Sequence, residues 1–366
     1  MSPLRRALLL AALAAPSVAA ETARAQGDDP VRRGRPILFP RDHGAHLRAR
    51  AEWWYATGWL GAADAPAAGF QLTFFRSRTG LAENSRSRFA ARQLLFAHAA
   101  LTQLTQQGQP GSPGATHQHD QRIMRWSGDV AAANGHAKVE DAELRIGNWQ
   151  LRRDGQRWLA RIPARGFTLD LSLRRTQAPL LQGDAGFSRK GPEELQASHY
   201  YSEPQLAAAS SDGRVGRAWL DHEWSDQILH PQAVGWDWIG INLFDGSALS
   251  AFVLRRRDGS ALWAGGSWRA AAGPAQTFTP DEVRFTAGRV WQSPGSGARY
   301  PVQWQVQTPA GRFELRALLD AQELDSRGST GTIYWEGLSE LLDAQGRRVG
   351  LGYLEMTGYA APLRLV

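Results

Sequence analysis

Short apolar runs separated by turn residues dominate the hydrophobic pattern of this chain. Each run is rich in aromatic and β-branched residues and too short for an amphipathic helix, as in Trp53–Leu60, Gly69–Arg76 and Trp238–Leu243. Pairs such as Asp154-Gly155 and Asp245-Gly246 punctuate the chain at hairpin spacing. Long stretches of helical periodicity are scarce. The pattern therefore predicts an all-β protein made of antiparallel strands.

The predicted strands are numerous enough for two closed barrels in tandem. A chain of 366 residues also exceeds the ~250–300 residues at which a single hydrophobic core stops growing. A faint repeat supports two units, because Trp53–Tyr55 and Trp236–Trp238 each open a strand with two tryptophans. We predict a flexible lead-in over residues 26–45, an N-terminal barrel over 46–228 and a C-terminal barrel over 229–366.

The composition removes several classes of chemistry. The chain has no cysteine, which excludes disulfides, thiol nucleophiles and zinc–thiolate sites. Its 42 Lys and Arg outnumber its 35 Asp and Glu, but the positive residues are scattered over turns and strand ends. No basic helix or stacking platform accompanies them, so we expect no nucleic-acid partner. The 15 tryptophans agree with a β-rich fold, since aromatic side chains suit a half-buried pleated surface.

Residues 1–25 have the three parts of a secretory signal. Arg5 and Arg6 form a positive start, Ala7–Ala15 is an unbroken apolar run, and small residues follow Pro16 at candidate cleavage sites. The run is short for a permanent anchor across ~30 Å of hydrocarbon, although a retained anchor and the twin-arginine route are alternatives. We predict a soluble, periplasmic or secreted protein whose mature chain has no transmembrane segment.

Four segments place acidic residues beside large aromatic side chains. They are Glu52–Tyr55, Asp221–Ser225 with the nearby Trp236–Trp238, Tyr334–Gly337, and Gly352–Tyr359. Side chains along a barrel strand alternate between its two faces. Such segments can therefore bury tryptophan rings while aiming a few acids or histidines at one chamber.

These segments resemble the AttH-like family, which includes the carotenoid 1,2-hydratases. The resemblance runs in the expected order from Glu52–Tyr55 to Gly352–Tyr359, nearly the whole predicted mature chain. It implies two lipocalin-like barrels that bind or convert an apolar, isoprenoid-like or polyketide-like molecule. AttH-type proteins associated with ABC transporter genes imply an ABC transporter as a partner. We expect neither a cofactor nor a metal.

Asp221 and His222 are the candidate catalytic pair. An apolar chamber raises the pKa of a carboxyl group and lets it donate a proton to an alkene. Tryptophan faces can then hold the resulting cation, a contact worth about 2 kcal/mol when dry. The predicted ligand-binding residues are Trp53, Trp54, Tyr55, Glu223, Trp224, Trp236, Trp238, Tyr334, Trp335 and Glu336.

The resemblance makes His222 and Trp224 the most transferable positions. It also implies a further Tyr and Asp on the strand beyond this motif in the hydratases. Here Leu249–Leu254 contains neither, which argues against carotenoid hydration itself.

Structural roles compete with each of these assignments. The paired tryptophans can fill barrel bottoms, and Asp221–Glu223 can form a hydrogen-bonded staple at the junction between barrels. Glu336 and Glu355 can bind backbone groups or arginines. Neighbours on one strand point to opposite faces, so Asp221, His222 and Glu223 cannot converge on one metal ion.

Two functions follow from the sequence. The first is binding of an apolar ligand by an exported protein that assists a transporter. The alternative is a cofactor-free hydratase, cyclase or isomerase acting on an unsaturated isoprenoid-like substrate. Both place the ligand either inside a barrel or at the join between barrels, and the sequence does not choose between these places.

Overall fold

The computed structural model describes residues 31–81, 84–85, 87, 90–104, 114–128, 135–227 and 229–363. The predicted signal at residues 1–25 lies outside these ranges. Over the described residues the structure is all-β apart from one 3-10 turn at Arg41–His43, which confirms the predicted class. None of the helical structure in these ranges has the length and apolar character needed to cross a bilayer.

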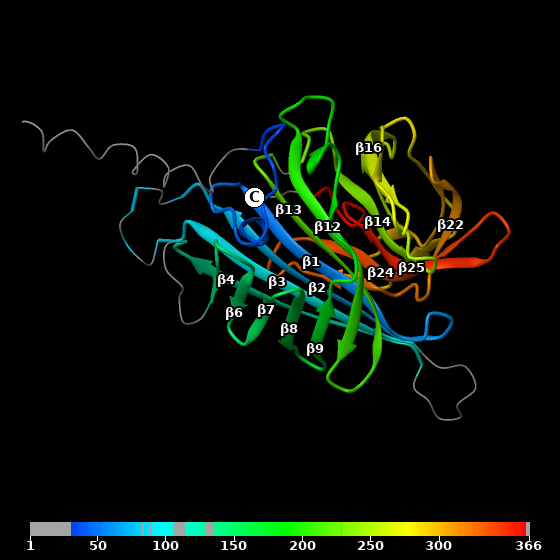
Figure 1. Cartoon of the computed structure of the whole chain (residues 1–366), viewed down its shortest axis with the longest axis horizontal. Helices are drawn as coiled ribbons and strands as arrows, with labels where there is room; N and C mark the ends of the chain where they lie inside the picture. Colours follow the sequence, from blue (N-terminus) through cyan, green and yellow to red (C-terminus); the bar gives the residue numbers. More distant parts are fainter. Residues whose placement is uncertain are drawn as a thin grey trace, which may run out of the picture.

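The first sheet is antiparallel and carries the N-terminal two thirds of the chain (Figure 1). Its strand order is β4-β3-β2-β1-β13-β12-β9-β8-β7-β6-β5. Strand β4 also contacts β5 and β6, so the two ends of the sheet approach and the barrel is nearly closed. Its strands are β1 (Ala51–Gly61), β2 (Pro66–Arg78), β3 (Gln93–Gln103), β4 (Thr116–Trp126), β5 (Gly135–Ala137), β6 (Glu143–Ile146), β7 (Trp149–Asp154), β8 (Arg157–Pro163), β9 (Thr168–Arg174), β12 (Ala197–Ser210) and β13 (Val215–Ser225), with β10 (Leu180–Leu181) and β11 (Phe187–Arg189) paired to β12.

The second sheet repeats this arrangement with the rest of the chain. Its order is β17-β16-β15-β14-β25-β24-β22-β21-β18. In both sheets the first strand lies between the second and the last, as closure of an antiparallel barrel requires. The strands are β14 (Gly235–Leu243), β15 (Ala248–Arg255), β16 (Ala261–Arg269), β17 (Ala275–Phe278), β18 (Arg284–Ala287), β21 (Gln303–Thr308), β22 (Gly311–Ala317), β24 (Ile333–Leu342) and β25 (Arg348–Met356), with β23 (Glu323–Asp325) on β24 and a separate pair of β19 (Val290–Gln292) and β20 (Arg299–Pro301).

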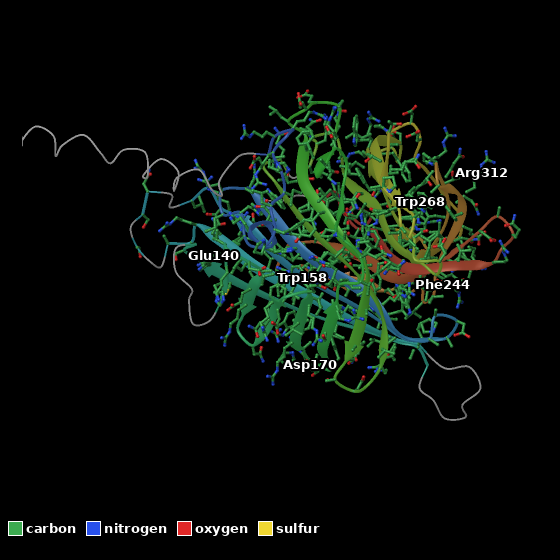
Figure 2. The ribbon with its side chains drawn as sticks, viewed as in Figure 1. Glu140, Trp158, Asp170, Phe244, Trp268 and Arg312 are labelled. Carbon is green, nitrogen blue, oxygen red and sulfur yellow. The ribbon has the colours of Figure 1, made fainter. Side chains whose placement is uncertain are left out.

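Each sheet surrounds its own apolar core. Trp54, Trp149 and Trp158 fill the first barrel, and Trp304 and Trp335 the second. Figure 2 shows Trp158 within the first barrel, whereas the exposed Asp170 lies at its outer edge. Both barrel interiors are therefore largely occupied by the protein's own side chains.

A third apolar cluster lies between the barrels. It contains Tyr55, Trp59, Trp219, Trp238 and Tyr353, from strands of both sheets. Strands such as β1 and β13 are consequently buried on both faces. The two sheets meet over these strands, which keeps the barrels packed against each other along one broad face.

The connection between the sheets runs from Ser225 to Gly235. The predicted division at residues 228 and 229 falls there and stays a prediction about independent folding units. The end of the predicted flexible lead-in is packed: Asp42, His43 and Ala45 are buried. The carbonyl of His43 accepts a hydrogen bond from Trp54 Nε1 at 2.9 Å, which ties this segment to the barrel interior.

Candidate functional site

A cavity of about 230 Å³ lies between the two barrels. It is lined by β1, β2, β3 and β13 from the first sheet and by β14, β15, β24 and β25 from the second. Pairing of β1 with β13 sets Trp53 opposite Glu223 and Tyr55 opposite Asp221, so these four side chains share one face of the sheet. The sequence left the site's place open, and the structure sets the lined cavity at the join.

Asp221 lines this cavity and accepts three side-chain hydrogen bonds. Its Oδ2 accepts from Tyr200 Oη at 2.8 Å, and its Oδ1 accepts from Ser202 Oγ at 2.5 Å and from Trp219 Nε1 at 2.7 Å. Burial raises the pKa of Asp221 to about 7, against the opposing effect of these donors. The carboxyl is thus divided between its acid and ionised forms near neutral pH.

Glu223 lies next to Asp221 on the same face but has a cationic partner. Lys190 Nζ is 3.1 Å from Glu223 Oε1, and Ser198 also donates to this carboxylate. The ammonium group lies over the rings of Tyr200 at 4.7 Å and Phe252 at 4.4 Å. Glu223 and Lys190 therefore form a neutral pair beside the apolar wall.

The second barrel contributes a pair of carboxyl groups to the opposite wall. Glu336 on β24 is directly across from Glu355 on β25. Burial, followed by the nearby Asp221 and Glu223 charges, raises the pKa of Glu355 to about 8, although the Trp236 indole opposes the rise. Burial and Glu355 together hold the pKa of Glu336 well above its usual range.

Among the residues that the structure describes, neither an arginine nor a backbone group hydrogen-bonds Glu336 Oε1, contrary to one of the structural alternatives. Within the described part of the chain, Glu336 Oε1 and Tyr55 Oη are buried without a hydrogen-bond partner of ordinary geometry. Tyr55 still lies close enough to Glu336 for that charge, added to the larger effect of burial, to raise the pKa of the phenol. Buried polar atoms without a well-formed hydrogen bond are rare in folded proteins, so this pair of side chains calls for an explanation.

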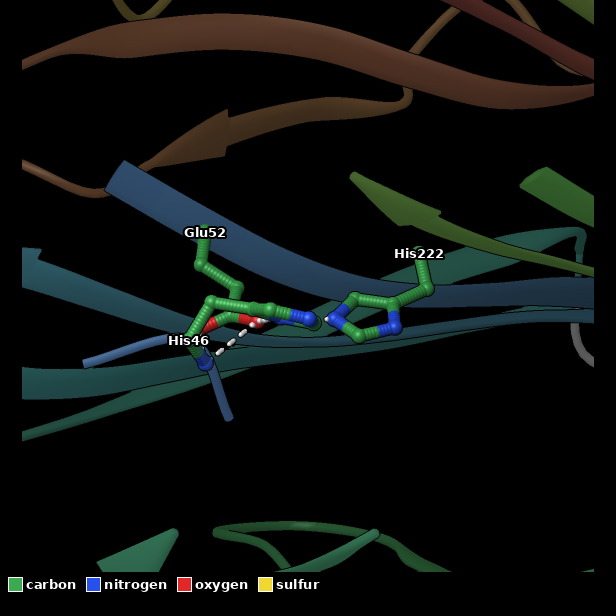
Figure 3. Close-up of side chains that lie close together, drawn as sticks. All are labelled: His46, Glu52 and His222. Carbon is green, nitrogen blue, oxygen red and sulfur yellow. Dashed lines mark hydrogen bonds and ion pairs between the residues drawn. The ribbon is translucent and has the colours of Figure 1, made fainter. Parts of the chain in front are cut away.

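His222 points away from the cavity, into the first barrel. Its Nε2 is 2.9 Å from Glu52 Oε1, and its ring stacks on Trp54 at 4.5 Å between centroids. Glu52 also accepts a hydrogen bond from Arg76 Nε at 2.8 Å. Figure 3 shows Glu52 between His222 and His46, whose Nδ1 is 2.7 Å from Glu52 Oε1. The structure therefore does not bring Asp221 and His222 together as a proton-handling pair, because neighbours on β13 face opposite ways.

His46, Glu52 and His222 have potential metal-ligand atoms within 4.8 Å of one another. The oxygens of Glu52 are already engaged by Arg76, His46 and His222. The fixed guanidinium of Arg76 would repel a cation at this point. The arrangement is that of a closed hydrogen-bonded network, in which burial lowers the pKa of His222 against the opposing effect of Glu52.

The structure divides the predicted ligand-binding residues into two groups. Those that line the cavity are Trp53, Tyr55, Asp221, Glu223, Trp236, Trp238, Tyr334 and Glu336. Trp54, His222 and Trp224 instead contribute to the buried end of the first barrel, where Trp224 stacks on His46 at 3.7 Å. Trp335 belongs to the core of the second barrel.

Sequence reasoning missed three contributors to the cavity. Lys190 and Tyr200 line the cavity but were not among the predicted site residues. The same holds for His98 on β3, whose Nδ1 is 2.8 Å from Tyr334 Oη. Glu355 belongs to one of the four acid-and-aromatic segments, but it was not named as a ligand-binding residue. Its place across from Glu336 follows from antiparallel pairing of two neighbouring strands, a signal that the sequence did contain.

The model of the AttH-like family matches residues 30–359. This chain belongs to the AttH-like family. A crystal structure of a Nitrosomonas europaea protein proposed to be an AttH is 42% identical, with a TM-score of 0.77, and the match covers 90% of this chain and 99% of that one. No curated protein sequence matches the chain.

Two further solved structures share the two-barrel fold of this AttH-like chain. Kievitone hydratase from Nectria haematococca is 12% identical, with a TM-score of 0.63 and coverage of 92% of this chain and 97% of that one. CghA is 13% identical, with a TM-score of 0.51 and coverage of 91% and 95%. At such identities the likeness establishes the fold, and it confirms the predicted lipocalin-like class.

Proposed function

We propose that this protein binds an unsaturated apolar small molecule between its barrels and converts it by acid catalysis, as a hydratase, isomerase or cyclase. The observation that carries the proposal is Asp221, a carboxyl with a pKa of about 7 that faces a tryptophan-lined cavity. A general acid works best when its pKa lies near the working pH. The protein's own side chains supply this chemistry.

Proton transfer from Asp221 begins the proposed reaction. The π electrons of the alkene form a C–H bond with the carboxyl proton, and positive charge develops on the other alkene carbon. In a hydratase, water adds at that carbon and loses a proton to the ionised Asp221. An isomerase would return a neighbouring proton of the same cation to the ionised Asp221. In a cyclase a second alkene would attack the cation, and the new cation would then lose a proton to the ionised Asp221.

The surroundings of Asp221 suit both of its protonation states. The hydroxyls of Tyr200 and Ser202 can donate to the carboxylate that remains after transfer, or accept from the acid before it. Trp219 Nε1 is a donor only and favours the carboxylate. Trp53, Trp236 and Trp238 supply ring faces to a developing cation, whose charge their quadrupoles attract.

The comparison with kievitone hydratase supports a hydratase as the reaction class, by analogy of fold alone. The missing Tyr and Asp in Leu249–Leu254 speak against a carotenoid as the substrate. Export to the periplasm and assistance to an ABC transporter stay proposals that rest on residues 1–25 and on the resemblance. Binding without conversion is the competing function, and the turnover experiment below separates the two.

Turnover in heavy water tests the reaction. Purified protein would be incubated with geraniol and longer polyprenyl alcohols in D₂O, and products followed by mass spectrometry. Acid catalysis places deuterium on carbon, with a water added or with the composition unchanged. We expect Asp221→Asn to lower the rate about 10²–10⁴-fold, the usual contribution of a general acid.

Asp212→Asn is the matched control, because Asp212 lies in an exposed turn and pairs with Arg214. It should keep the wild-type rate. Equal rates in the Asp221 and Asp212 variants would disprove the catalytic role of Asp221. Tight binding of these alcohols with no carbon-bound deuterium would favour the carrier instead.

A further inference from the structure

Negative groups in the cavity outnumber their positive partners. Asp221, Glu223, Glu336 and Glu355 all line it, while its cationic side chains are Arg76 and Lys190. Arg76 is fully engaged with Glu52, Gln93 and the carbonyls of His46 and Ala49 on the barrel side. Lys190 pairs with Glu223. The Glu336–Glu355 pair thus has no cationic partner among the residues that the structure describes.

The part of the cavity wall that contains Glu336, Glu355 and Tyr55, here called the corner, has the features of a ligand-binding position. Tyr55 is 6% exposed and Glu336 2% exposed, and their side chains lie close together. Over the described residues, each has a buried polar atom without a hydrogen-bond partner of ordinary geometry. Both side chains line the cavity, as does the half-buried Glu355. Directly opposed residues of an antiparallel pair have Cβ atoms about 5 Å apart, so one small group can reach both carboxyls.

An ammonium group matches this corner better than a hydroxyl or a carboxylate. It carries a positive charge and donors alone, whereas Glu336, Glu355 and the lone pairs of Tyr55 Oη are acceptors. Trp53, Trp236 and Trp238 line the same cavity, and such rings attract a desolvated cation. A carboxylate ligand would add its charge beside two carboxyl groups that have no cationic partner within the described part of the chain.

We infer that the natural ligand is an apolar molecule carrying a protonated amine, whose nitrogen binds at the corner formed by Tyr55, Glu336 and Glu355. The apolar part of this ligand extends along the tryptophan wall towards Asp221. This inference rests on the proposed function for the cavity it uses and adds the chemical class of the head group. The cavity volume, slightly below the ~300–1,000 Å³ usual for drug-sized ligands, favours a small skeleton.

Binding of a cation at this corner is linked to proton release. Without a ligand the raised pKa of Glu355, about 8, keeps that carboxyl largely protonated at neutral pH. A bound ammonium favours the ionised pair, so its affinity rises as the pH increases from 6 to 9 while the amine itself stays charged. The titratable and charged groups facing the pair are Asp221 and Glu223 of β13, Tyr55 of β1, Tyr334 of β24, Tyr353 of β25, and Lys190.

Three probes with one carbon skeleton test the inference: geranylamine, geraniol and geranic acid. Their dissociation constants would be measured by quenching of tryptophan fluorescence in the full chain. We expect geranylamine to bind about tenfold or more tighter than geraniol at pH 8, and geranic acid to bind most weakly. The preference for the amine should shrink at pH 6.

Substitutions of the two carboxyl groups test whether they cause the preference for the amine. Glu336→Gln and Glu355→Gln should each reduce the amine preference, and together abolish it, while the affinity for geraniol stays within about twofold. Glu340→Gln is the matched control, since Glu340 lies on the same strand, outside the cavity lining, and pairs with Arg348 at 2.6 Å. Tyr55→Phe, which keeps both carboxyls, should lose part of the preference and serves if a Gln variant does not fold.

The outcomes separate this inference from the proposed function. Equal binding of amine and alcohol overturns the ammonium inference and leaves the apolar cavity standing. An amine preference that survives removal of both carboxyls overturns its placement at this corner. Failure of all three probes to bind overturns the amine inference and the apolar-ligand site together.

Discussion

The two faces of β13 and β1 carry polar groups of opposite character. On the inner face, Glu52, His222, His46 and Arg76 satisfy one another in a closed network at the end of the first barrel. On the outer face, Asp221 lines a cavity that also contains the orphaned atoms of Tyr55 and Glu336. Arg76 pairs with Glu52 on the inner face, whereas on the outer face the described cation, Lys190, pairs with Glu223 and not with Asp221.

This difference distinguishes structure from function in residues that are adjacent along the chain. A buried charge that is fully paired stabilises a single arrangement, and breaking the pair leaves an uncompensated ion. A buried polar atom without a partner is tolerated where a ligand completes it. The inner network is therefore best explained as an anchor for the segment at Asp42–His46, and the outer group as the site.

The largest expected loss of stability comes from breaking the hydrogen-bonded network around Glu52 on the inner face. Arg76→Met removes the guanidinium that faces Glu52 and leaves a buried carboxylate unpaired, so we expect a loss of about 3–5 kcal/mol in the free energy of unfolding. Asp221→Asn, on the outer face, should cost less than about 1 kcal/mol, because its pKa near 7 already makes the neutral form common. Urea denaturation measures both. Similar losses in the two variants would contradict the distinction between the faces.

A smaller loss of stability is expected from a substitution at Gly69, where the two barrels are in close contact. A Cβ added at Gly69 would lie 2.8 Å from Tyr353 Oη and 2.9 Å from Leu338 Cβ, both on the second barrel. Gly69→Ala should therefore cost about 1–3 kcal/mol through overpacking. Gly114→Ala is the control, because nothing lies within 4 Å of its added Cβ. An unchanged Gly69 variant would show that the barrels separate easily.

The smallest expected effect is a change in how stability depends on pH. The raised pKa of Glu355 means that the folded state keeps a proton which the unfolded state loses above about 4.5. Its stabilising contribution is complete below that pH and is lost as the pH rises to about 8. Glu355→Gln should flatten this decline by about 1 kcal/mol or more. The free energy of unfolding of the wild-type protein and of Glu355→Gln would be measured at pH 5, 7 and 9. An equal decline in the two proteins would refute the raised pKa of Glu355.

The fold and half of the candidate site were predictable from local pattern. The strand predicted at Trp53–Leu60 is β1, and Trp238–Leu243 lies within β14. Acid-and-aromatic segments located Asp221, Glu336 and the tryptophans of the cavity. The pairing of Asp221 with His222 does not occur, although strand alternation, which argued against a metal at the same residues, applies equally to a catalytic pair.

The sequence by itself determined the strands, the two-barrel class and which residue types could do chemistry, because turn residues, side-chain alternation and apolar runs are local properties. Only the tertiary structure decided which face of each strand is the inside of a barrel and which faces the other barrel. A strand that is buried on both faces has no exposed polar side, so its sequence does not indicate which face lies inside the barrel. Glu52 meets Arg76 and the distant His222 only once β1 pairs with β2 and β13 in the first sheet. Glu336 meets Tyr55 of the other barrel only once the two sheets have packed.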